Sequence, residues 1–515
     1  MVQTTGPGPS FSPKPDGHST YRPGMDEPPE DIDIPMRVEK DSLGEHDVPA
    51  HAYWGIHTAR ALENFPITRR AISNYPDMIR GLARVKQAAA RANRDIGVLS
   101  PEKAAIIDQV CEELVQGRWH DQFVLGAVQG GAGTSTNMCA NEVIANRGLE
   151  IMGYDKGDYQ HLHPIDDVNR SQSTNDVYPS AIKIGMVFGV RRLAAEHKLL
   201  SESFAAKGRE FADVLKVGRT QLQDAVPMTL GQEFRGFANT LGEDQDRIEE
   251  TVPFLCEVNL GATAIGTGIT ADHRYPEAVR AHLAELTGLA IHTAPDLIEA
   301  TSDAGVFMTL SGVLKRSAVK LSKICNDLRL LSSGPQAGFG EINLPARQAG
   351  SSIMPGKVNP VIPEVVNQVA FAIIGSDATV TAAAEAGQLQ LNAFEPIIAA
   401  SMMQSMVWLT NACKTLRVNC IDGITANHDR LHQMVEASVG VVTALTPYIG
   451  YVKAAAIAHE ALAGGGTVRE LVIAQGLMAA TELDSVLSPS RLSGLSLATG
   501  AIILPPSAVD PEHAG

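Results

Sequence analysis

The sequence lacks most of the features that would mark a particular kind of protein at once. Aromatic residues make up only 5% of its 515 residues, while alanine and leucine are plentiful. This favours packed helices over β-sandwiches, because aromatic residues are enriched in strands. The six cysteines are scattered, with no CxxC spacing and no histidine cluster beside them, which argues against a zinc site or a disulfide framework. No apolar run approaches the roughly 20 residues that a membrane helix needs.

Positive charge is also scarce. The 42 lysines and arginines are outnumbered by 58 aspartates and glutamates, which gives a formal net charge of −16. Such a surface repels nucleic acid phosphates and anionic lipid, so we expect neither nucleic acid nor a membrane as a partner. It would also repel a small anionic substrate, so a site for one needs local positive groups. Reduced cysteines and the absence of a signal peptide predict a cytoplasmic protein.

The length predicts two to three domains. Residues 1–36 are rich in proline and poor in aliphatic residues, which is typical of a disordered tail. After this tail we expect a mostly helical N-terminal domain over residues 37–170 and a central bundle of long helices over residues 171–426. A small helical domain and a loose tail are expected over residues 427–515.

Two long stretches show helical spacing most clearly. Over residues 304–332 apolar side chains recur at three- and four-residue steps, which predicts a helix about 40 Å long. Ser302 or Asp303 could cap that helix. A second pattern covers residues 363–409 and is expected to break near Pro396. Apolar residues on more than one side of such helices indicate a bundle that also buries surface between subunits.

Four segments carry small polar residues that a plain core or linker does not require. They are QGGAGTSTNMCANEVIANR (129–147), DDVNRSQSTNDVYPSAIKIG (166–185), VGRTQLQDAVPMTLGQEF (217–234) and QAGSSIMPGKVNP (348–360). The first two lead into helices, and free N–H groups at a helix start bind anions. Serine, threonine and asparagine are also the usual helix caps, so each motif taken alone is open to a purely structural interpretation.

The last of these segments contains the strongest indication of chemistry. Lys357 and Asn359 stand just before an expected helix start at residues 361–364. A cation, an amide and a helix N-terminus together would hold a carboxylate. Ser351 and Ser352 lie in a loop bounded by glycine and proline, which could place a hydroxyl over a substrate. A flexible loop with a solvated lysine is the alternative that composition alone leaves open.

The stretch GSSIMPGKVN matches the signature loop GSSxMPxKxN at every fixed position. With this loop and the other three segments in the family's order, the chain resembles the fumarase/aspartase superfamily from about Val38 to the late 480s. The resemblance implies a mainly α, three-domain fold with a central long-helix bundle. It also implies a homotetramer, in which four bundles form a 20-helix core and each active site is shared between three subunits.

Within the superfamily, the blocks VNLGATAIGTG, DLIEATSD and EAGQLQLN resemble aspartases. Gln221 stands after GRT, where a fumarase has histidine. The resemblance therefore implies the reversible anti-elimination of ammonia from L-aspartate to give fumarate, through an enediolate (aci-carboxylate) intermediate. A class II fumarase, which interconverts malate and fumarate, is the alternative on the same fold. A non-catalytic structural homologue is the third interpretation.

The resemblance also implies roles for individual residues. Ser351 corresponds to the general base. Because a serine hydroxyl is a poor base, it must act as an alkoxide or nearly so, stabilised by loop amides and Lys357 in a closed, dry site. The other residues are expected to bind substrate: Thr134, Ser173, Thr174 and Ser352 at the β-carboxylate, Thr220, Lys357 and Asn359 at the α-carboxylate, and Asn175 and Gln221 around the amino group. No cofactor is required, and a divalent cation such as Mg²⁺ is expected at most as an activator.

Overall fold

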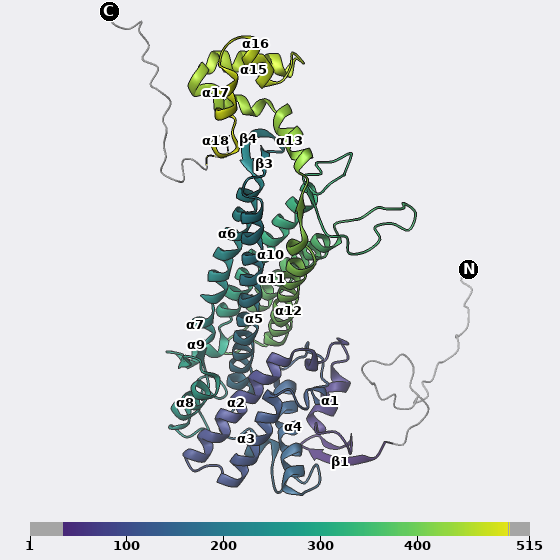
Figure 1. Ribbon diagram of the computed structural model, residues 1–515. Helices are drawn as coiled ribbons and strands as arrows, with labels where there is room; N and C mark the ends of the chain where they lie inside the picture. The colour runs from purple at the N-terminus through teal and green to yellow at the C-terminus, as the bar shows by residue number, and fades with distance from the viewer. Residues whose placement is uncertain (1–33, 493, 495–515) are drawn as a thin grey trace, which may run out of the picture.

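The computed structural model describes residues 34–492 and 494, which form an elongated, mainly helical molecule (Figure 1). An N-terminal group of helices lies at one end, a bundle of long helices runs away from it, and a small C-terminal group of helices lies at the far end. The mainly α fold expected from the sequence is therefore confirmed. The predicted disordered tail falls almost entirely on residues outside those described, as does the chain after residue 494.

The N-terminal part combines a small hairpin with four helices. The hairpin pairs β1 with β2 in antiparallel register. The elements of the N-terminal part are β1 (Met36–Asp41), β2 (Gly44–Pro49), α1 (Ile56–Asn64), α2 (Pro76–Asp95), α3 (Pro101–Val115) and α4 (Thr134–Met152). Helices α2 and α3 begin with proline, which fits the first turn because no N–H is needed there. Both helices coincide with stretches, residues 76–97 and 101–117, in which apolar residues recur at helical spacing.

Five long helices form the bundle, and each packs against two neighbours in the ring order α6, α5, α12, α11, α10. Their bounds are α5 (Thr174–Glu210), α6 (Leu230–Glu249), α10 (Gly305–Leu331), α11 (Val361–Glu385) and α12 (Glu395–Asn419). The break predicted near Pro396 is confirmed, since α12 begins there after a turn, with the proline in its first helical turn. The N-cap residue of α10 is Ala304, which provides no side-chain cap, although Asp303 before it accepts a hydrogen bond from the Gly305 N–H at 2.9 Å. Ser302 does not cap the helix, because its hydroxyl donates back to the Glu299 carbonyl.

Short elements connect the bundle at both ends. Between α6 and α10 lie α7 (Val252–Leu255), β5 (Glu257–Val258), α8 (Tyr275–Thr287), β6 (His292–Thr293) and α9 (Leu297–Ser302). At the far end, α5 and α6 are joined by the hairpin of β3 (Leu215–Thr220) and β4 (Gln223–Thr229). The C-terminal part contains β8 (Thr425–Ala426), which pairs with β7 (Ile342–Asn343), and the helices α13 (His428–Ala437), α14 (Thr446–Ile449), α15 (Tyr451–Leu462), α16 (Val468–Ala474), α17 (Ala480–Val486) and α18 (Pro489–Leu492).

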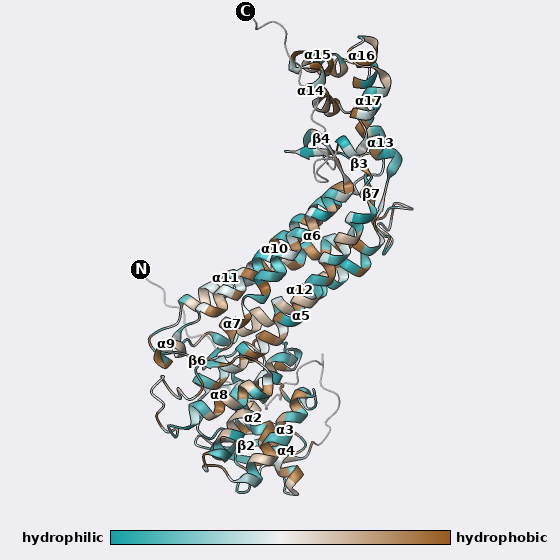
Figure 2. Cartoon of the chain, turned by 60° about the vertical axis from the view of Figure 1, so that its left-hand side comes forward, coloured by the Kyte–Doolittle hydropathy of each residue, from teal (hydrophilic) through white to brown (hydrophobic). Residues whose placement is uncertain are grey.

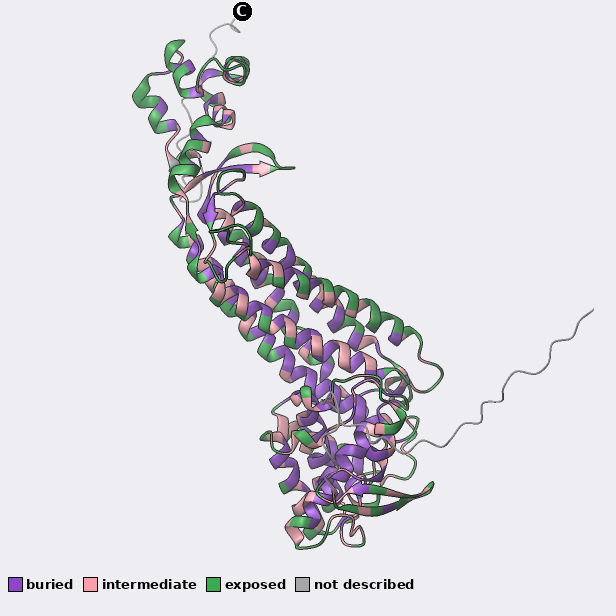
Figure 3. Cartoon of the chain, turned by 90° about the vertical axis from the view of Figure 1, so that its right-hand side faces the viewer, coloured by how far each residue is buried: buried purple, intermediate pink, exposed green. Residues whose placement is uncertain are grey.

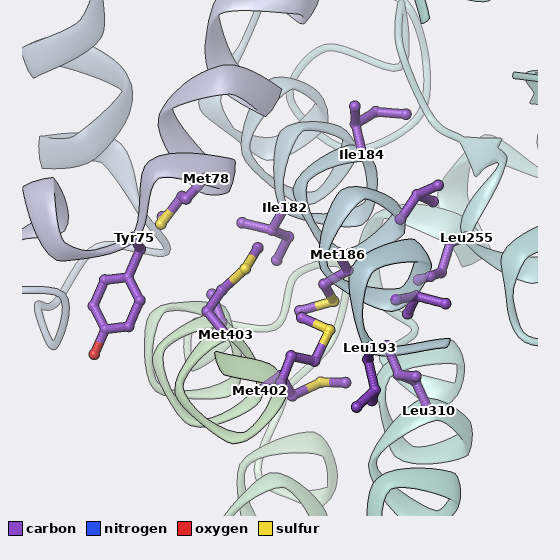
Figure 4. Close-up of a cluster of buried hydrophobic side chains, with 14 of the residues drawn as sticks. Tyr75, Met78, Ile182, Ile184, Met186, Leu193, Leu255, Leu310, Met402 and Met403 are labelled. Carbon is purple, nitrogen blue, oxygen red and sulfur yellow. The ribbon is translucent and has the colours of Figure 1, made fainter. Parts of the chain in front are cut away.

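The buried side chains form two hydrophobic clusters. The larger cluster runs without a break from the N-terminal helices into the bundle. In Figure 4, Met402 and Met403 of α12 face Met186 of α5, close to Met78 of α2. Flexible methionines suit such a junction because they fill irregular gaps between helices of different direction. The second cluster joins the C-terminal helices to one another, together with Val217 of β3. The domain boundaries drawn from the sequence remain predictions.

Helix α11 carries apolar residues on an outer face. Among the described residues it is the one helix long and apolar enough, by length and composition, to cross a membrane. It lies here between α10 and α12, and its Asp377 accepts a hydrogen bond from Lys315 of α10 at 2.5 Å. Figures 2 and 3 show apolar and exposed residues along the outer faces of the bundle. All six cysteines are buried and unpaired, as expected for reduced core residues.

The junction between α2 and α5 depends on glycine. A Cβ added to Gly81 of α2 would lie 2.1 Å from the carbonyl oxygen of Ala181, and one added to Gly185 of α5 would lie 2.7 Å from that of Asp77. The two helix backbones are therefore in direct contact, and no side chain fits between them. This crossing fixes the direction in which the bundle leaves the N-terminal part.

We expect Gly81→Ala to lower the free energy of unfolding by about 1–3 kcal/mol or more, because the methyl group must push two helix backbones apart. Urea unfolding followed by circular dichroism measures this change. Gly236→Ala in α6 is the matched control: nothing lies within 4 Å of the added Cβ, and alanine favours a helix over glycine by roughly 0.5–1 kcal/mol. A Gly81→Ala variant as stable as the unaltered protein would contradict this packing.

Candidate active site

The first two polar segments meet where α4 and α5 begin. Ser173 caps α5, since its Oγ accepts the Asn175 N–H at 3.3 Å and the Asp176 carboxylate completes a capping box. The Oγ1 of Thr174 accepts from Nδ2 of Asn137, in the first turn of α4, at 3.0 Å. Two helix N-termini therefore lie against each other, and each contributes the positive end of its helix dipole. This arrangement suits a carboxylate.

The remaining predicted residues of these segments lie in the same place. Thr134 is exposed as the first residue of α4, and its hydroxyl donates to the Gly131 carbonyl at 2.8 Å. Asn175 donates from its Nδ2 to the carbonyl of Ala264 at 2.7 Å, so the loop between β5 and α8 also borders this region. Thr134, Ser173, Thr174 and Asn175 are thus brought together by the fold.

The backbone is strained at the entry to both helices. Gly131, Ala132 and Gly133 have consecutive left-handed conformations, with φ of 82°, 54° and 87°, and Ser171 has φ of 60°. This conformation costs a residue with a side chain roughly 1–2 kcal/mol. The space before α4 also excludes a side chain, because a Cβ on Gly133 would lie 2.5 Å from the Tyr178 ring. Strain that persists in a packed region points to a functional constraint.

The third segment forms the β3–β4 hairpin at the other end of α5. Gln221 and Leu222 occupy the two central positions of its turn, with φ of 54° and 63°, between the paired residues Thr220 and Gln223. Such a turn with two left-handed residues normally takes Asn-Gly. Here it carries two residues with large side chains, and it holds Thr220 and Gln221 exposed at the tip.

Buried charges anchor this hairpin to the chain that leads into the fourth segment. The Glu341 carboxylate, which has no exposed surface, pairs with Arg219 at 2.5 Å and with Lys216 at 2.8 Å. The Arg219 guanidinium also lies over the ring of Phe339, 4.2 Å from its centroid. The hairpin is therefore held to the chain just before the 348–360 loop.

The fourth segment is a loop with a closed neck. The Gly350 N–H donates to the Lys357 carbonyl at 2.7 Å, and Nδ2 of Asn359 donates to the Gly350 carbonyl at 2.7 Å. A Cβ on Gly350 would lie 2.4 Å from the Lys357 carbonyl oxygen, so only glycine permits this approach. Asn359 therefore closes the neck of the loop, while Lys357 and Ser352 lie exposed beyond it. No ion pair or hydrogen bond to any described residue holds the Lys357 ammonium.

Ser351 has a special environment inside this loop. Its Oγ accepts hydrogen bonds from the N–H groups of Ile353, at 3.1 Å, and Met354, at 3.0 Å. Hydrogen bonds donated to the oxygen stabilise its negative form and lower the cost of losing the proton. The loop thus supplies part of what a serine needs to act as a base.

The four segments do not form one site within a single chain. Helix α5 has 37 residues, which corresponds to a length of about 55 Å. Thr134, Ser173, Thr174 and Asn175 lie at its start, whereas the hairpin follows its end and the 348–360 loop lies beside that far end of the bundle (Figure 1). A small substrate cannot touch both groups of residues in the same chain.

A buried polar cluster behind the helix starts was not predicted from the sequence. Lys86 of α2 is fully buried and donates to Oδ1 of Asn169 at 2.8 Å and to Oε1 of Gln172 at 2.9 Å. Burial lowers the pKa of Lys86 to about 7. Its signal in the sequence was a lysine at helical spacing from the buried Leu82 and Ala90, that is, on the core face of its helix.

Asp176 is the buried acid of this region. Its carboxylate accepts from the N–H groups of Ser173, Gly261 and Thr263, and burial raises its pKa to about 6. Within residues 34–492 no group of three or more histidine, cysteine, aspartate or glutamate side chains is placed to hold a metal ion. The residues predicted to form the site carry hydroxyls, amides and one lysine.

Comparison with known proteins identifies the family. The lyase family model matches residues 44–375, and the model of the fumarase C C-terminus matches residues 441–494. The chain is 59% identical over 458 residues to an aspartate ammonia-lyase of Pseudomonas fluorescens, covering 89% of this chain and 96% of that protein.

Two solved structures share the architecture. The fumarate lyase:delta crystallin from Brucella melitensis bound to cobalt has a TM-score of 0.87 at 54% identity, covering 89% of this chain and 99% of that one. The class II fumarase from Schistosoma mansoni has a TM-score of 0.83 at 33% identity, with the same coverage of both chains. The fold, the four polar segments in their order and these matches together show that the chain belongs to the fumarase/aspartase superfamily of lyases.

Proposed function

We propose that this protein catalyses the reversible elimination of ammonia from L-aspartate to give fumarate, the reaction of an aspartate ammonia-lyase. The observation that carries the proposal is the Ser351 hydroxyl, whose oxygen accepts two backbone N–H groups at 3.0–3.1 Å in an exposed, closed-neck loop. Similarity to the Pseudomonas fluorescens aspartate ammonia-lyase over nearly the whole chain supports the choice of substrate.

The difficult step is removal of a proton from the carbon next to the β-carboxylate. That carbon is a weak acid unless the carboxylate can take up a second negative charge as an enediolate, so preorganised donors around the carboxylate should supply the largest stabilisation. Thr134, Ser173, Thr174 and Ser352 are the proposed donors. Ser351 removes the proton as an alkoxide or nearly so, and ammonia leaves from the opposite face of the substrate.

The other end of the substrate needs a clamp and a neutral neighbour. Lys357 supplies the positive charge for the α-carboxylate, with Thr220 and Asn359 beside it, on a chain of net charge −16. Asn175 and Gln221 surround the amino group. Since the ammonium of aspartate can depart as neutral ammonia, it needs no acid comparable to the histidine that would protonate a departing hydroxide. Closure of the 348–360 loop would exclude water.

We further propose that the protein is a homotetramer with a 20-helix core, in which each active site takes residues from three subunits. The separation of roughly 55 Å along α5 supports this, because the two groups of polar residues can meet only between chains. Each bundle helix except α6 also exposes large apolar side chains, which suit burial between subunits. They are Leu199 on α5, Met308, Val319 and Leu330 on α10, Val365, Phe371 and Ile374 on α11, and Val407 and Val418 on α12.

The proposed reaction uses a small dicarboxylic amino acid and no cofactor. A divalent cation such as Mg²⁺ would act as an activator at most. Buried cysteines without disulfides suit a reducing compartment, so we propose a cytoplasmic enzyme.

We expect Ser351→Ala to reduce kcat for aspartate by about 10³-fold or more, the range of a lost general base, while the oligomer stays intact. Fumarate absorbance measures the rate, and size-exclusion chromatography checks the assembly. Ser333→Ala is the matched control, since its Oγ also accepts a backbone N–H, from Phe339, in the same α10–α11 connection. Wild-type turnover by Ser351→Ala would show that Ser351 is not the general base. Fumarate formation from malate but not from aspartate would overturn the proposed reaction.

Mixing two inactive variants tests whether the site is shared. Ser351→Ala and Thr174→Val alter opposite ends of the bundle, so random assembly of the two chains should restore about a quarter of the sites, each with both parts intact from different subunits. Co-expression with distinguishable tags, followed by assay of the mixed species, measures the recovery. Ser351→Ala mixed with Lys357→Ala is the control, because both changes lie in one loop and no site escapes both. Equal lack of recovery in the two mixtures would contradict the shared site.

A further inference from the structure

A chain of hydrogen bonds links buried Lys86 to the Thr174 hydroxyl. Lys86 Nζ donates to Oδ1 of Asn169 at 2.8 Å. The same oxygen accepts from Nδ2 of Asn137 at 3.2 Å and from Nδ2 of Asn141 at 3.1 Å. Asn137 then donates from Nδ2 to Thr174 Oγ1 at 3.0 Å. Three helices, α2, α4 and α5, are thereby connected through side-chain amides.

Lys86 and the Gln172 carbonyl together fix the direction of the bonds in this chain. An ammonium donates and cannot accept, whereas an amide can turn either its oxygen or its nitrogen towards a neighbour. Facing Lys86, Asn169 must present its oxygen, and its Nδ2 then donates to the Gln172 carbonyl at 3.2 Å. Asn137 must consequently present its nitrogen to Asn169, and the same nitrogen faces Thr174.

The consequence reaches the substrate side of the helix start. Because Thr174 Oγ1 accepts from Asn137, its own hydrogen is directed away from the cluster and is available to a ligand. The Oδ1 of Asn137 is buried without a hydrogen-bond partner among the described residues. The amide thus holds this orientation although its oxygen gains nothing, which is costly for a buried polar atom.

We propose that Lys86 is a positioning residue, which fixes the direction of this hydrogen-bond chain and so keeps the Thr174 hydroxyl as a donor to the substrate carboxylate. The inference rests on the proposed function, in which Thr174 binds the β-carboxylate. Without Lys86 the charged donor to Asn169 is lost, and only the Gln172 carbonyl and Asn141 still oppose a turn of the Asn169 and Asn137 amides. Thr174 would then donate to Asn137, and the site would lose a donor to the enediolate.

A second buried lysine separates this role from general packing. Lys183, on α5, is also buried and donates to the Glu257 carbonyl at 3.0 Å. Burial lowers its pKa as well, opposed by nearby carboxylates that include Glu257 and Glu395. No hydrogen bond links it to Thr174 among the described residues. Lys183 therefore has the burial of Lys86 without its connection to the site.

A double-mutant cycle tests the proposal. We expect Lys86→Met to lower kcat/KM for aspartate by about 10–100-fold, the scale of a misplaced group in a site, and Thr174→Val to lower it at least as much. In the Thr174→Val background Lys86→Met should have almost no further effect, because the hydroxyl that it orients is gone. Lys183→Met is the matched control, and its effect should multiply with that of Thr174→Val.

Four further outcomes are informative. Unchanged kcat/KM in Lys86→Met, or losses that multiply in Lys86→Met/Thr174→Val, would overturn the inference. If Lys86→Met does not assemble, Asn137→Ala interrupts the hydrogen-bond chain at the residue next to Thr174. This variant then replaces Lys86→Met in the double-mutant cycle with Thr174→Val. If the unaltered protein turns over malate and not aspartate, the proposed function fails, and the cycle run with malate still decides the role of Lys86.

Discussion

The length of α5 constrains everything else in this protein. A 37-residue helix is a rod about 55 Å long, and the chain places polar, strained segments at both of its ends. No side chain crosses that distance, so residues at the two ends can serve one small molecule only if another copy of the chain lies alongside in the opposite direction. The need for a neighbouring copy also explains the exposed apolar side chains on α10 and α11, which such a copy would cover.

An acidic chain must hold a small anion with few cations. The proposed site residues include one lysine, Lys357, and the other favourable groups are hydroxyls, amides and backbone N–H groups at helix starts or in tight turns. Those donors are preorganised by backbone strain, seen at Ala132 and Gln221, and by the closed neck of the loop at Gly350. Fixed dipoles of this kind stabilise developing charge without reorganising during the reaction, which suits an enediolate better than a mobile surface charge would.

Buried ionisable groups support the site from behind. Asp176 ties the start of α5 to the loop at Gly261, and Lys86 fixes the amides that face α4 and α5. Both groups pay a desolvation cost, visible as the lowered pKa of Lys86 and the raised pKa of Asp176. Such a cost is tolerated where hydrogen bonds satisfy the group and where it secures one arrangement of polar side chains.

The sequence by itself determined the helices, because their signals are local. The 3.6-residue spacing marked α2, α3 and α10, proline marked the start of α12, and the serine before Thr174 marked the cap of α5. It also predicted which polar segments carry the chemistry, through the match of the 348–360 loop. Only the tertiary structure decided how these parts are distributed: the separation of the segments, the strained tip at Gln221 and the contact of Lys86 with Asn169. Those features depend on residues dozens of positions apart, whose contacts follow from packing and helix length, and no local pattern records them.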